Sequence, residues 1–588
     1  MTILAGPTLA GPALAEAEGV GALTIGGFLR EVCERFADHE ALVFDDPLRE
    51  GTTVGWTYAE LERQARRVAR ALVAAGVSKG TRVGILMGNR PEAVAAWFGA
   101  PLVGAVVVPL STFSPRPELD HLLRHADVSV LLTQTTLLGR DFLGDVIALC
   151  PEAGRPETTE GGRRRDGGEQ REDGPMATVT FPFLRRVAAV GLAAPAGRIQ
   201  PWEAFLASGD DVGEALVDAM AAQVAPSDHG LIIYSSGTTD RPKGMLHNHR
   251  APTLQCWLQA GVFGRHERTR MWTALPMFWT AGMNTAMGAT LAAGGCWVMQ
   301  EVFEPGEALR LMARERVTEP YTLPHQTAAL EEHPDWAGTD LSSLRCVFGK
   351  SAFARHPSVT GDTGWNMPVA YGLSETCAIF ITHRFDTPRE LLRQSMGRLL
   401  PGNRLRIVDP GTGRILGPDA DGELAIAGPT LMEHYVKVDR DQCFDIDGFF
   451  HTGDVGYYDE AGYVHWTGRR TEMIKTGGAN VSPAELEVQL RACQPVKLAR
   501  VVGVPDPRLG ELVVLCVTLK DGATATAAEI RSFLRERVAA YKVPRHVLFF
   551  GDGDIPMTGS DTKVRDAELV RLVEERLRPP APPSPPLT

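Results

Sequence analysis

The stretch LIIYSSGTTDRPKG, residues 231–244, joins a short apolar run to a loop rich in hydroxyl side chains. Its first four residues predict a buried strand, and the polar residues that follow predict a turn or loop. Glycines let backbone N–H groups turn toward an anion, and Thr238, Thr239 and Lys243 add further donors. The stretch predicts a triphosphate-binding loop, although a Ser/Thr-rich turn without a ligand fits the same residues.

The loop does not follow the Walker A pattern. Pro242 precedes the lysine where that pattern has glycine, and Gly244 follows it where the pattern has serine or threonine. A kinase or a P-loop ATPase is therefore disfavoured.

Apolar strand-like runs alternate with helical periodicity through the first two-thirds of the chain, which predicts an α/β fold. Thr57 and Glu60 predict a capped helix start, and residues 83–87 and 105–108 predict buried strands. Residues 93–110 are uncharged, but Pro101 and Pro109 interrupt them, so a helix followed by a strand is favoured over a membrane span.

Further motifs follow in a fixed order along the chain: GNRPEAVAAWFGAPLVGAVVVPLS at 88–111, YGLSET at 371–376, HTGD at 451–454, GR at 468–469 and IKTGGANVSPAELE at 474–487. Together with YSSGTTDRPKG, they resemble the adenylate-forming superfamily of acyl-CoA synthetases, firefly luciferases and peptide-synthetase adenylation domains. The resemblance runs from about residue 57 to about residue 568 and is closest to bacterial-type fatty acid or carboxylic acid–CoA ligases.

The resemblance implies two unequal domains. Residues 1–467 would form a large ATP- and acid-binding domain of layered mixed sheets and helices, and residues 468–577 a small mobile α+β domain with its hinge near 469–472. Thr471 stands where the family usually has Asp or Lys at the hinge. Residues 154–175 lack aliphatic and aromatic side chains and predict a disordered insertion, and the Pro-rich residues 578–588 predict an extended tail.

The resemblance also implies the nucleotide contacts. Thr238, Thr239 and Lys243 would bind the phosphates of ATP, with Thr239 also catalytic. Tyr371 would contact the adenine, Ser374 would lie near the α-phosphate, and Glu375 would be the catalytic carboxylate that holds Mg²⁺. Asp454 would accept hydrogen bonds from the ribose, Arg469 would add a donor there, and Gly477 and Gly478 would border a tunnel for the pantetheine arm of coenzyme A (CoA). The implied cofactors and co-substrates are ATP, Mg²⁺ and CoA.

Lys563 is the lysine to which the resemblance assigns adenylation. It would bridge the carboxylate oxygen and the α-phosphate as charge develops. It appears one residue later than in the family, in PMTGSDTKVR at 556–565, and an exposed structural lysine is the alternative.

PMFWTAG at 276–282 resembles the segment that lines the acid pocket in this family, and VFGKSA at 347–352 resembles a Gly-Gly-Ala-like segment near the adenine. The resemblance implies that Phe278, Trp279, Met283 and Gly349 line the substrate pocket. Many relatives have histidine in place of Trp279, and a large indole would shorten, gate or flatten the pocket. A core tryptophan is the alternative. His247 and His249 form an isolated HxH pair with no third ligand suggested, so no metal site is predicted there.

Net charge and cysteine content limit the classes of binding partner and the cellular location that we expect. The 588 residues carry a net charge of −12, which disfavours a nucleic-acid binder. Nine cysteines without a CxxC pair indicate reduced thiols and a cytoplasmic protein, and no signal peptide or integral membrane segment is predicted. The expected partners are a small-molecule carboxylic acid, ATP and CoA, with a homodimer possible.

The predicted function is an ATP-dependent acyl-CoA synthetase that forms acyl-AMP and pyrophosphate from a largely apolar acid, then acyl-CoA and AMP. Two alternatives stay open: an acyl-AMP ligase that loads a carrier protein, and a catalytically silent nucleotide- or acyl-binding homologue. An amino-acid adenylation domain is less consistent, because that class usually has an aspartate in the segment where Phe278 and Trp279 stand. A luciferase-like oxidation is not distinguished by the motifs.

Overall fold

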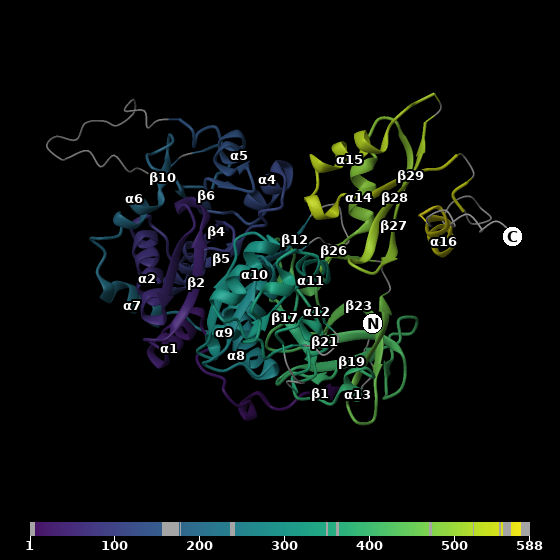
Figure 1. Cartoon of the computed structure of the whole chain (residues 1–588), viewed down its shortest axis with the longest axis horizontal. Coiled ribbons are helices and arrows are strands. Elements are labelled where there is room, and N and C mark those ends of the chain that lie inside the picture. Colours follow the sequence, from purple (N-terminus) through teal and green to yellow (C-terminus); the bar gives the residue numbers. More distant parts are fainter. Residues whose placement is uncertain are drawn as a thin grey trace.

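The computed structural model describes residues 6–155, 176, 178–235, 242–347, 351–359, 364–469, 473–520, 522–551, 554–556 and 566–577. These residues form an α/β protein with a large N-terminal part and a smaller C-terminal part, which is drawn in yellow-green at the upper right of Figure 1. The predicted α/β class with two unequal parts is confirmed. The predicted insertion, hinge and tail lie mainly or wholly outside the described residues, and the exact domain boundaries stay predictions.

An eight-stranded mixed sheet contains the runs that the sequence predicts as buried strands. Its parallel part continues into the antiparallel hairpin of β11 and β12. Both faces of the sheet are covered, which explains why its central strands are apolar without alternation. In spatial order the strands are β10 (Ile199–Pro201), β9 (Arg186–Val190), β6 (Val130–Gln134), β4 (Arg82–Leu86), β5 (Val106–Pro109), β11 (His229–Ser235), β12 (Lys243–Asn248) and β22 (His434–Tyr435).

A second sheet of five strands contributes to the same core. Its order is β15 (Glu319–Pro320), β13 (Arg270–Thr273), β14 (Cys296–Met299), β2 (Glu40–Asp46) and β3 (Thr52–Thr57). The largest apolar core contains residues of both sheets and of several helices, among them α1 (Ile25–Arg35), α2 (Tyr58–Ala74), α3 (Pro91–Leu102), α8 (Arg250–Phe263) and the π-helical segment η3 (Ala281–Gly288). As predicted, the Thr57 hydroxyl accepts a hydrogen bond from the backbone N–H of Glu60 at the start of α2.

The uncharged stretch at 93–110 forms most of α3 and then β5, with α3 buried on nearly all sides. Among the helices in the described ranges, none combines the length and the apolar composition that a membrane crossing requires.

Shorter elements cover the outer faces of the two sheets. On the eight-stranded sheet, α4 (Arg116–His125) and α5 (Phe142–Leu149) enclose a second core. On the five-stranded sheet, α10 (Pro305–Arg314), α11 (Pro324–Glu331) and α12 (Ala352–Arg355) enclose a third. The other short helices of this part are η1 (Leu14–Glu16), η2 (Pro47–Arg49), α6 (Trp202–Ala207), α7 (Glu214–Ala222), α9 (Ala289–Ala292), η4 (Trp336–Gly338), α13 (Arg389–Leu392) and η5 (Arg440–Gln442), and β7 (Thr136–Leu137) pairs with β8 (Arg140–Asp141).

Two antiparallel sheets complete the N-terminal part. One contains β1 (Leu9–Ala10), β19 (Arg404–Val408), β20 (Ile415–Leu416), β21 (Gly422–Ala427), β23 (Phe450–Tyr458) and β24 (Val464–Arg469). The other contains β16 (Ala370–Leu373), β17 (Ala378–Thr382) and β18 (Arg398–Leu399). The predicted motifs YGLSET and HTGD begin on β16 and β23 respectively, so tertiary folding has to bring these two segments together.

The C-terminal part is a small α+β unit. Its sheet contains β26 (Ala479–Val481), β25 (Ile474–Thr476), β28 (Gly510–Leu519), β27 (Val496–Asp506) and β29 (His546–Phe549). The helices α14 (Pro483–Leu490) and α15 (Ala527–Arg535) share one core with this sheet, α16 (Asp566–Leu577) shares another, and η6 (Ala540–Lys542) precedes β29. Ser482 caps α14, because its side chain accepts a hydrogen bond from the backbone N–H of Glu485.

Candidate functional site

A cavity of about 700 Å³, here called the strand-end cavity, lies where β12, β16, β22 and β23 approach one another. Of the predicted nucleotide-binding residues, Lys243, Ser374 and Glu375 line it directly. Residues 451–453 of the HTGD motif line it as well, and Met473 and Asn480 of the C-terminal part close one side. Motifs that lie far apart in the sequence therefore share one cavity.

Lys243 is positioned by the β11–β12 hairpin. Ser235 and Lys243 are paired across this hairpin, so both chain ends of the loop start at the cavity. The Lys243 Nζ lies 5.2 Å from the centre of the Tyr435 ring, within the range of a cation–π interaction. Thr238 and Thr239 lie outside the described residues, so their phosphate contacts stay predictions.

Tyr435 also contacts the predicted metal ligand. Its hydroxyl donates a hydrogen bond of 2.7 Å to Oε1 of Glu375. The turn that carries Glu375 is held by Thr376, whose hydroxyl accepts from the backbone N–H of Leu373 and donates to the carbonyl of Ala378. Tyr435 was missed by the sequence analysis, and no local pattern marks it, because its role comes from the pairing of β22 with β12.

The two residues predicted to contact the adenine and the ribose, Tyr371 and Asp454, are hydrogen-bonded to each other. The Tyr371 hydroxyl donates a hydrogen bond of 2.8 Å to Oδ2 of Asp454, which is buried. The backbone N–H of Asp454 donates to the Thr452 hydroxyl, and that of Gly453 donates to Oε1 of Glu423. The Tyr371 hydroxyl therefore orients the Asp454 carboxylate to which the resemblance assigns the ribose.

Glu423 is a second residue that the sequence analysis missed. Besides holding Gly453, it lies 3.3 Å from the Nδ1 of His451, while Asp445 lies 3.6 Å from the Nε2 of the same ring. The hydrogen bond to Glu423 raises the pKa of His451 against the effect of burial, and the charge of Asp445 adds to the rise. Arg469 pairs in register with Asp454 where β24 meets β23.

His247 and His249 have different structural roles. The Nε2 of His247 donates to the carbonyl of Ser374 over 2.9 Å, and burial lowers the pKa of His247 to about 4, so the ring is neutral. The Nδ1 of His249 accepts from the backbone N–H of Ile25. Within the described ranges, no group of three or more His, Cys, Asp or Glu side chains could hold a metal ion. A metal at Glu375 would therefore need ligands from a bound nucleotide and water.

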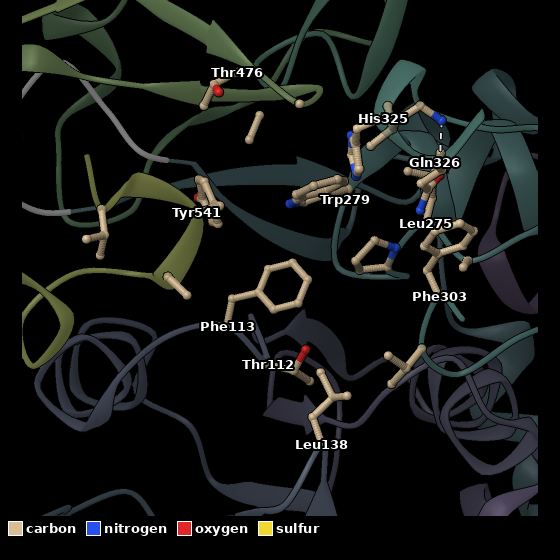
Figure 2. A pocket seen from close by; sticks show the side chains of 18 of the residues that line it. Thr112, Phe113, Leu138, Leu275, Trp279, Phe303, His325, Gln326, Thr476 and Tyr541 are labelled. Carbon is tan, nitrogen blue, oxygen red and sulfur yellow. Dashed lines mark hydrogen bonds between the residues drawn. The ribbon is translucent and has the colours of Figure 1, made fainter. Parts of the chain in front are cut away.

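A second cavity of about 770 Å³, here called the interdomain channel, lies between the N-terminal and C-terminal parts (Figure 2). Phe278, Trp279 and Gly477 of the predicted residues line it, together with Tyr541 of η6. The Tyr541 ring centre lies 6.1 Å from that of Phe113 and 6.4 Å from that of Trp279. Trp279 is thus part of an aromatic cluster that both parts of the protein share.

The β25–β26 turn needs glycine at both of its central positions. Gly477 has φ +56° and Gly478 has φ +82°, a backbone region that side chains with Cβ rarely adopt. A Cβ on Gly478 would lie 2.5 Å from the Leu323 side chain of the N-terminal part. The two glycines therefore allow the turn to lie directly against the opposite wall of the channel.

Consecutive residues separate the two cavities. On the N-terminal side Trp279 lines the channel and Thr280 the strand-end cavity, and on the C-terminal side Ala479 lines the channel and Asn480 the strand-end cavity. Side chains that alternate along β26 explain the second pair. The cavities therefore lie on two sides of one thin partition.

The predicted acid-pocket residues do not all lie together. Phe278 and Trp279 line the channel, whereas Ala281, Thr285 and Tyr321 line the strand-end cavity. Met283 is 0% exposed, packs in the main core and is not among the residues that line either cavity. Gly349 lies outside the described residues. The acid pocket therefore stays a prediction.

Several basic residues line the interdomain channel. Arg531 and Arg535 of α15 line it together with Arg545 and His546. The Nε of Arg531 is buried and has no hydrogen-bond partner in the part of the chain that the structure describes. This group of cations is suited to an anionic ligand.

The sequence matches two families along its length. Residues 29–436 match the family described as AMP-binding enzyme, and residues 485–562 match the AMP-binding enzyme C-terminal domain. The chain is 31% identical over 525 residues to a feruloyl-CoA synthase of Amycolatopsis sp, covering 88% of this chain and 93% of that protein. It is also 31% identical over 528 residues to an indoleacetate–CoA ligase of Aromatoleum aromaticum, covering 88% and 94%.

Among solved structures, the amide bond synthetase McbA from Marinactinospora thermotolerans is similar, with a TM-score of 0.71 and 25% identity. The similarity covers 93% of this chain and 99% of that one. Both the large and the small part of the chain therefore match enzymes of known structure.

Proposed function

The chain belongs to the AMP-binding enzyme family and is an AMP-forming acid–thiol ligase, and we propose that its two cavities divide the work of an acyl-CoA synthetase. An apolar carboxylate and ATP would react in the strand-end cavity to give acyl-AMP and pyrophosphate. The thiol of CoA would then reach the acyl carbon through the interdomain channel, giving the thioester, AMP and a proton. The observation that carries this proposal is the thin partition between the cavities, formed by residues 279–280 and 479–480.

The first step would depend on charge compensation. A carboxylate is a poor electrophile until its oxygen is converted into a phosphate leaving group. Lys243 and Ser374, which both line this cavity, would contact the phosphates, and Thr238 and Thr239 would add donors. Tyr371 would pack on the adenine, while Asp454 and Arg469 would bind the ribose.

Glu375 is suited to hold a magnesium ion that is also bound to the phosphates of ATP. Mg²⁺ commonly uses one or two carboxylates and completes its octahedron with phosphate oxygens and water. The hydrogen bond from Tyr435 fixes one oxygen of Glu375 and so orients the carboxylate at the cavity. When bound, Mg²⁺ would offset the negative charge of the phosphates.

The second step would use the channel from both parts of the protein. The Gly477–Gly478 turn forms one wall, and the aromatic cluster around Trp279 and Tyr541 forms another. Arg531, Arg535 and Arg545, which also line the channel, would bind the phosphates of CoA. This feature favours CoA over a carrier protein as the acyl acceptor.

The acid would be largely apolar. Four of the residues that line the strand-end cavity, Ala281, Tyr321, Met367 and Ile379, carry no charge. Relatives named for ferulate and indoleacetate suggest that aryl acids belong in the substrate panel. Medium-chain fatty acids form the second arm of the same panel.

The test is carboxylate-dependent release of pyrophosphate from Mg-ATP across this panel, followed by CoA-dependent release of AMP. We expect turnover with at least one apolar acid, and thioester only when CoA is present. Lys563→Ala should abolish acyl-AMP formation but leave thioester formation from supplied acyl-AMP. Absence of turnover with every acid would contradict the proposal, and acyl transfer to a carrier protein but not to CoA would favour the alternative ligase.

The domain boundary near residue 468, a cytoplasmic location and a homodimer belong to the same proposal. We expect the two parts to change their relative orientation between the two steps, with residues 469–472 as the hinge. Light scattering of the purified protein tests the dimer, and cell fractionation tests the location.

A further inference from the structure

A buried cation lies at the interface between the two parts of the protein. Lys542 belongs to η6 of the C-terminal part, and its side chain is 1% exposed. Its Nζ lies 2.8 Å from Oε1 of Glu485 in α14 of the same part. It also lies 3.6 Å from Oε2 of Glu118, which belongs to α4 of the N-terminal part. One ammonium group therefore faces carboxylates from both sides of the interface.

Glu118 is held in place to receive this cation. Its side chain is 8% exposed, and its Oε1 accepts a hydrogen bond of 2.8 Å from the Ser114 hydroxyl. Burial opposes the charge on Lys542, but Tyr541, Glu118 and Glu485 together raise its pKa above the ordinary value, so the ammonium stays charged. Removing one partner from a buried charged group is costly, so loss of the Glu118 carboxylate should weaken this interface.

The residue before Lys542 makes the second contact across the same interface. Figure 2 shows the Tyr541 ring next to Phe113 and Trp279 of the N-terminal part. The two adjacent residues thus contact the N-terminal part differently, one through aromatic packing and one through charge. Together they fix the orientation of η6 on the N-terminal part.

We infer that Glu118 is a positioning residue for thioester formation, because it holds Lys542 and thereby keeps the Gly477–Gly478 turn at the interdomain channel. This inference rests on the proposed function, in which adenylation uses a different orientation of the C-terminal part. In that orientation Glu118 and Lys542 separate, Glu118 keeps its bond to Ser114, and Lys542 keeps Glu485. The pair therefore shifts the balance between the two orientations toward the one used in the second step.

The test measures the two half-reactions separately for Glu118→Gln. Adenylation is followed by exchange of labelled pyrophosphate into ATP, and thioester formation by a single turnover of supplied acyl-AMP with CoA. We expect the thioester step to slow by about tenfold or more, because the amide no longer offers Lys542 a charge. Adenylation should stay within about twofold of the native enzyme. Ser114→Ala should slow the same step by a smaller factor, and Glu118→Asp should restore part of the rate.

Glu332→Gln is the matched control. Glu332 in the N-terminal part pairs with Arg508 in the C-terminal part, but the side chains are 59% and 63% exposed. An exposed pair contributes little, so both half-reactions should stay near the native rates.

Equal loss of both half-reactions in Glu118→Gln, or no loss in either, would overturn the inference. A native enzyme that adenylates no acid would instead contradict the proposed function. In that case small-angle X-ray scattering still tests the pair. Glu118→Gln should shift the protein away from the orientation in which Glu118 meets Lys542, while Glu332→Gln should not. Identical scattering curves for native protein and Glu118→Gln would then overturn the inference.

Discussion

Replacing Asp454 by asparagine tests the ribose assignment most directly. Asp454 is 3% exposed, and its Oδ2 accepts the hydroxyl of Tyr371 at 2.8 Å, so the carboxylate is already positioned before any nucleotide binds. Asparagine keeps the shape of the side chain, removes the charge and replaces one acceptor oxygen with a donor. The change therefore tests the charge-assisted hydrogen bonds without opening a cavity.

The size of the effect follows from the number of bonds lost. A hydrogen bond to a charged group contributes about 1.5–3 kcal/mol, and the amide oxygen can still accept from one ribose hydroxyl. Loss of one such bond raises the KM for ATP by about 10- to 150-fold at 1.4 kcal/mol per factor of ten. Because the amide oxygen keeps one of these bonds, the lower end, about 10- to 30-fold, is expected.

The assay is the initial rate of pyrophosphate release at saturating acid with ATP varied. Tyr371→Phe is the matched control, because it keeps the ring for the adenine and removes only the hydroxyl that donates to Asp454. Its KM for ATP should stay within about threefold of the native value or fall. An unchanged KM in Asp454→Asn, or an equal rise in Tyr371→Phe, would refute the assignment of Asp454 to the ribose. Melting temperatures of both variants exclude a general loss of folding.

Three further predictions concern stability, metal use and pH. Arg90 is fully buried among three carboxylates, so Arg90→Met should lower the free energy of unfolding by about 3–5 kcal/mol in denaturant titrations. The control is Arg384→Met at an exposed ion pair, which should change the free energy of unfolding by less than about 1 kcal/mol. Tyr435→Phe removes the donor that orients Glu375 and should raise the Mg²⁺ concentration for half-maximal adenylation by about tenfold, while an unchanged requirement would contradict the metal assignment. Folding raises the pKa of His451, so protonated His451 stabilises the folded state. This contribution is complete below the pKa of the unfolded chain and is lost as the pH rises through the higher pKa of the folded state. The melting-temperature difference between native protein and His451→Gln should therefore shrink from about pH 6 to about pH 8, and a constant difference would exclude this linkage.

Local sequence determined the secondary structure around the site. The cap at Thr57, the cap at Ser482 and the strands β4, β5 and β11 depend on residues that are neighbours in the chain, and all five are present in the structure. Periodicity and capping are local properties, so they can be recognised before any tertiary contact is known. The ordered motifs likewise identified the family, because each motif is a continuous segment.

Only the tertiary structure decided which side chains meet. Tyr435 donates to Glu375, and Lys542 lies between Glu118 and Glu485, because strands and helices that are distant in sequence pack together there. The same packing places Trp279 at the interdomain channel and Met283 in the core, although they are one helical turn apart in the sequence. The type of chemistry therefore follows from continuous motifs, whereas the partition between the two cavities and the charge pair across the interface depend on long-range packing that no local pattern encodes.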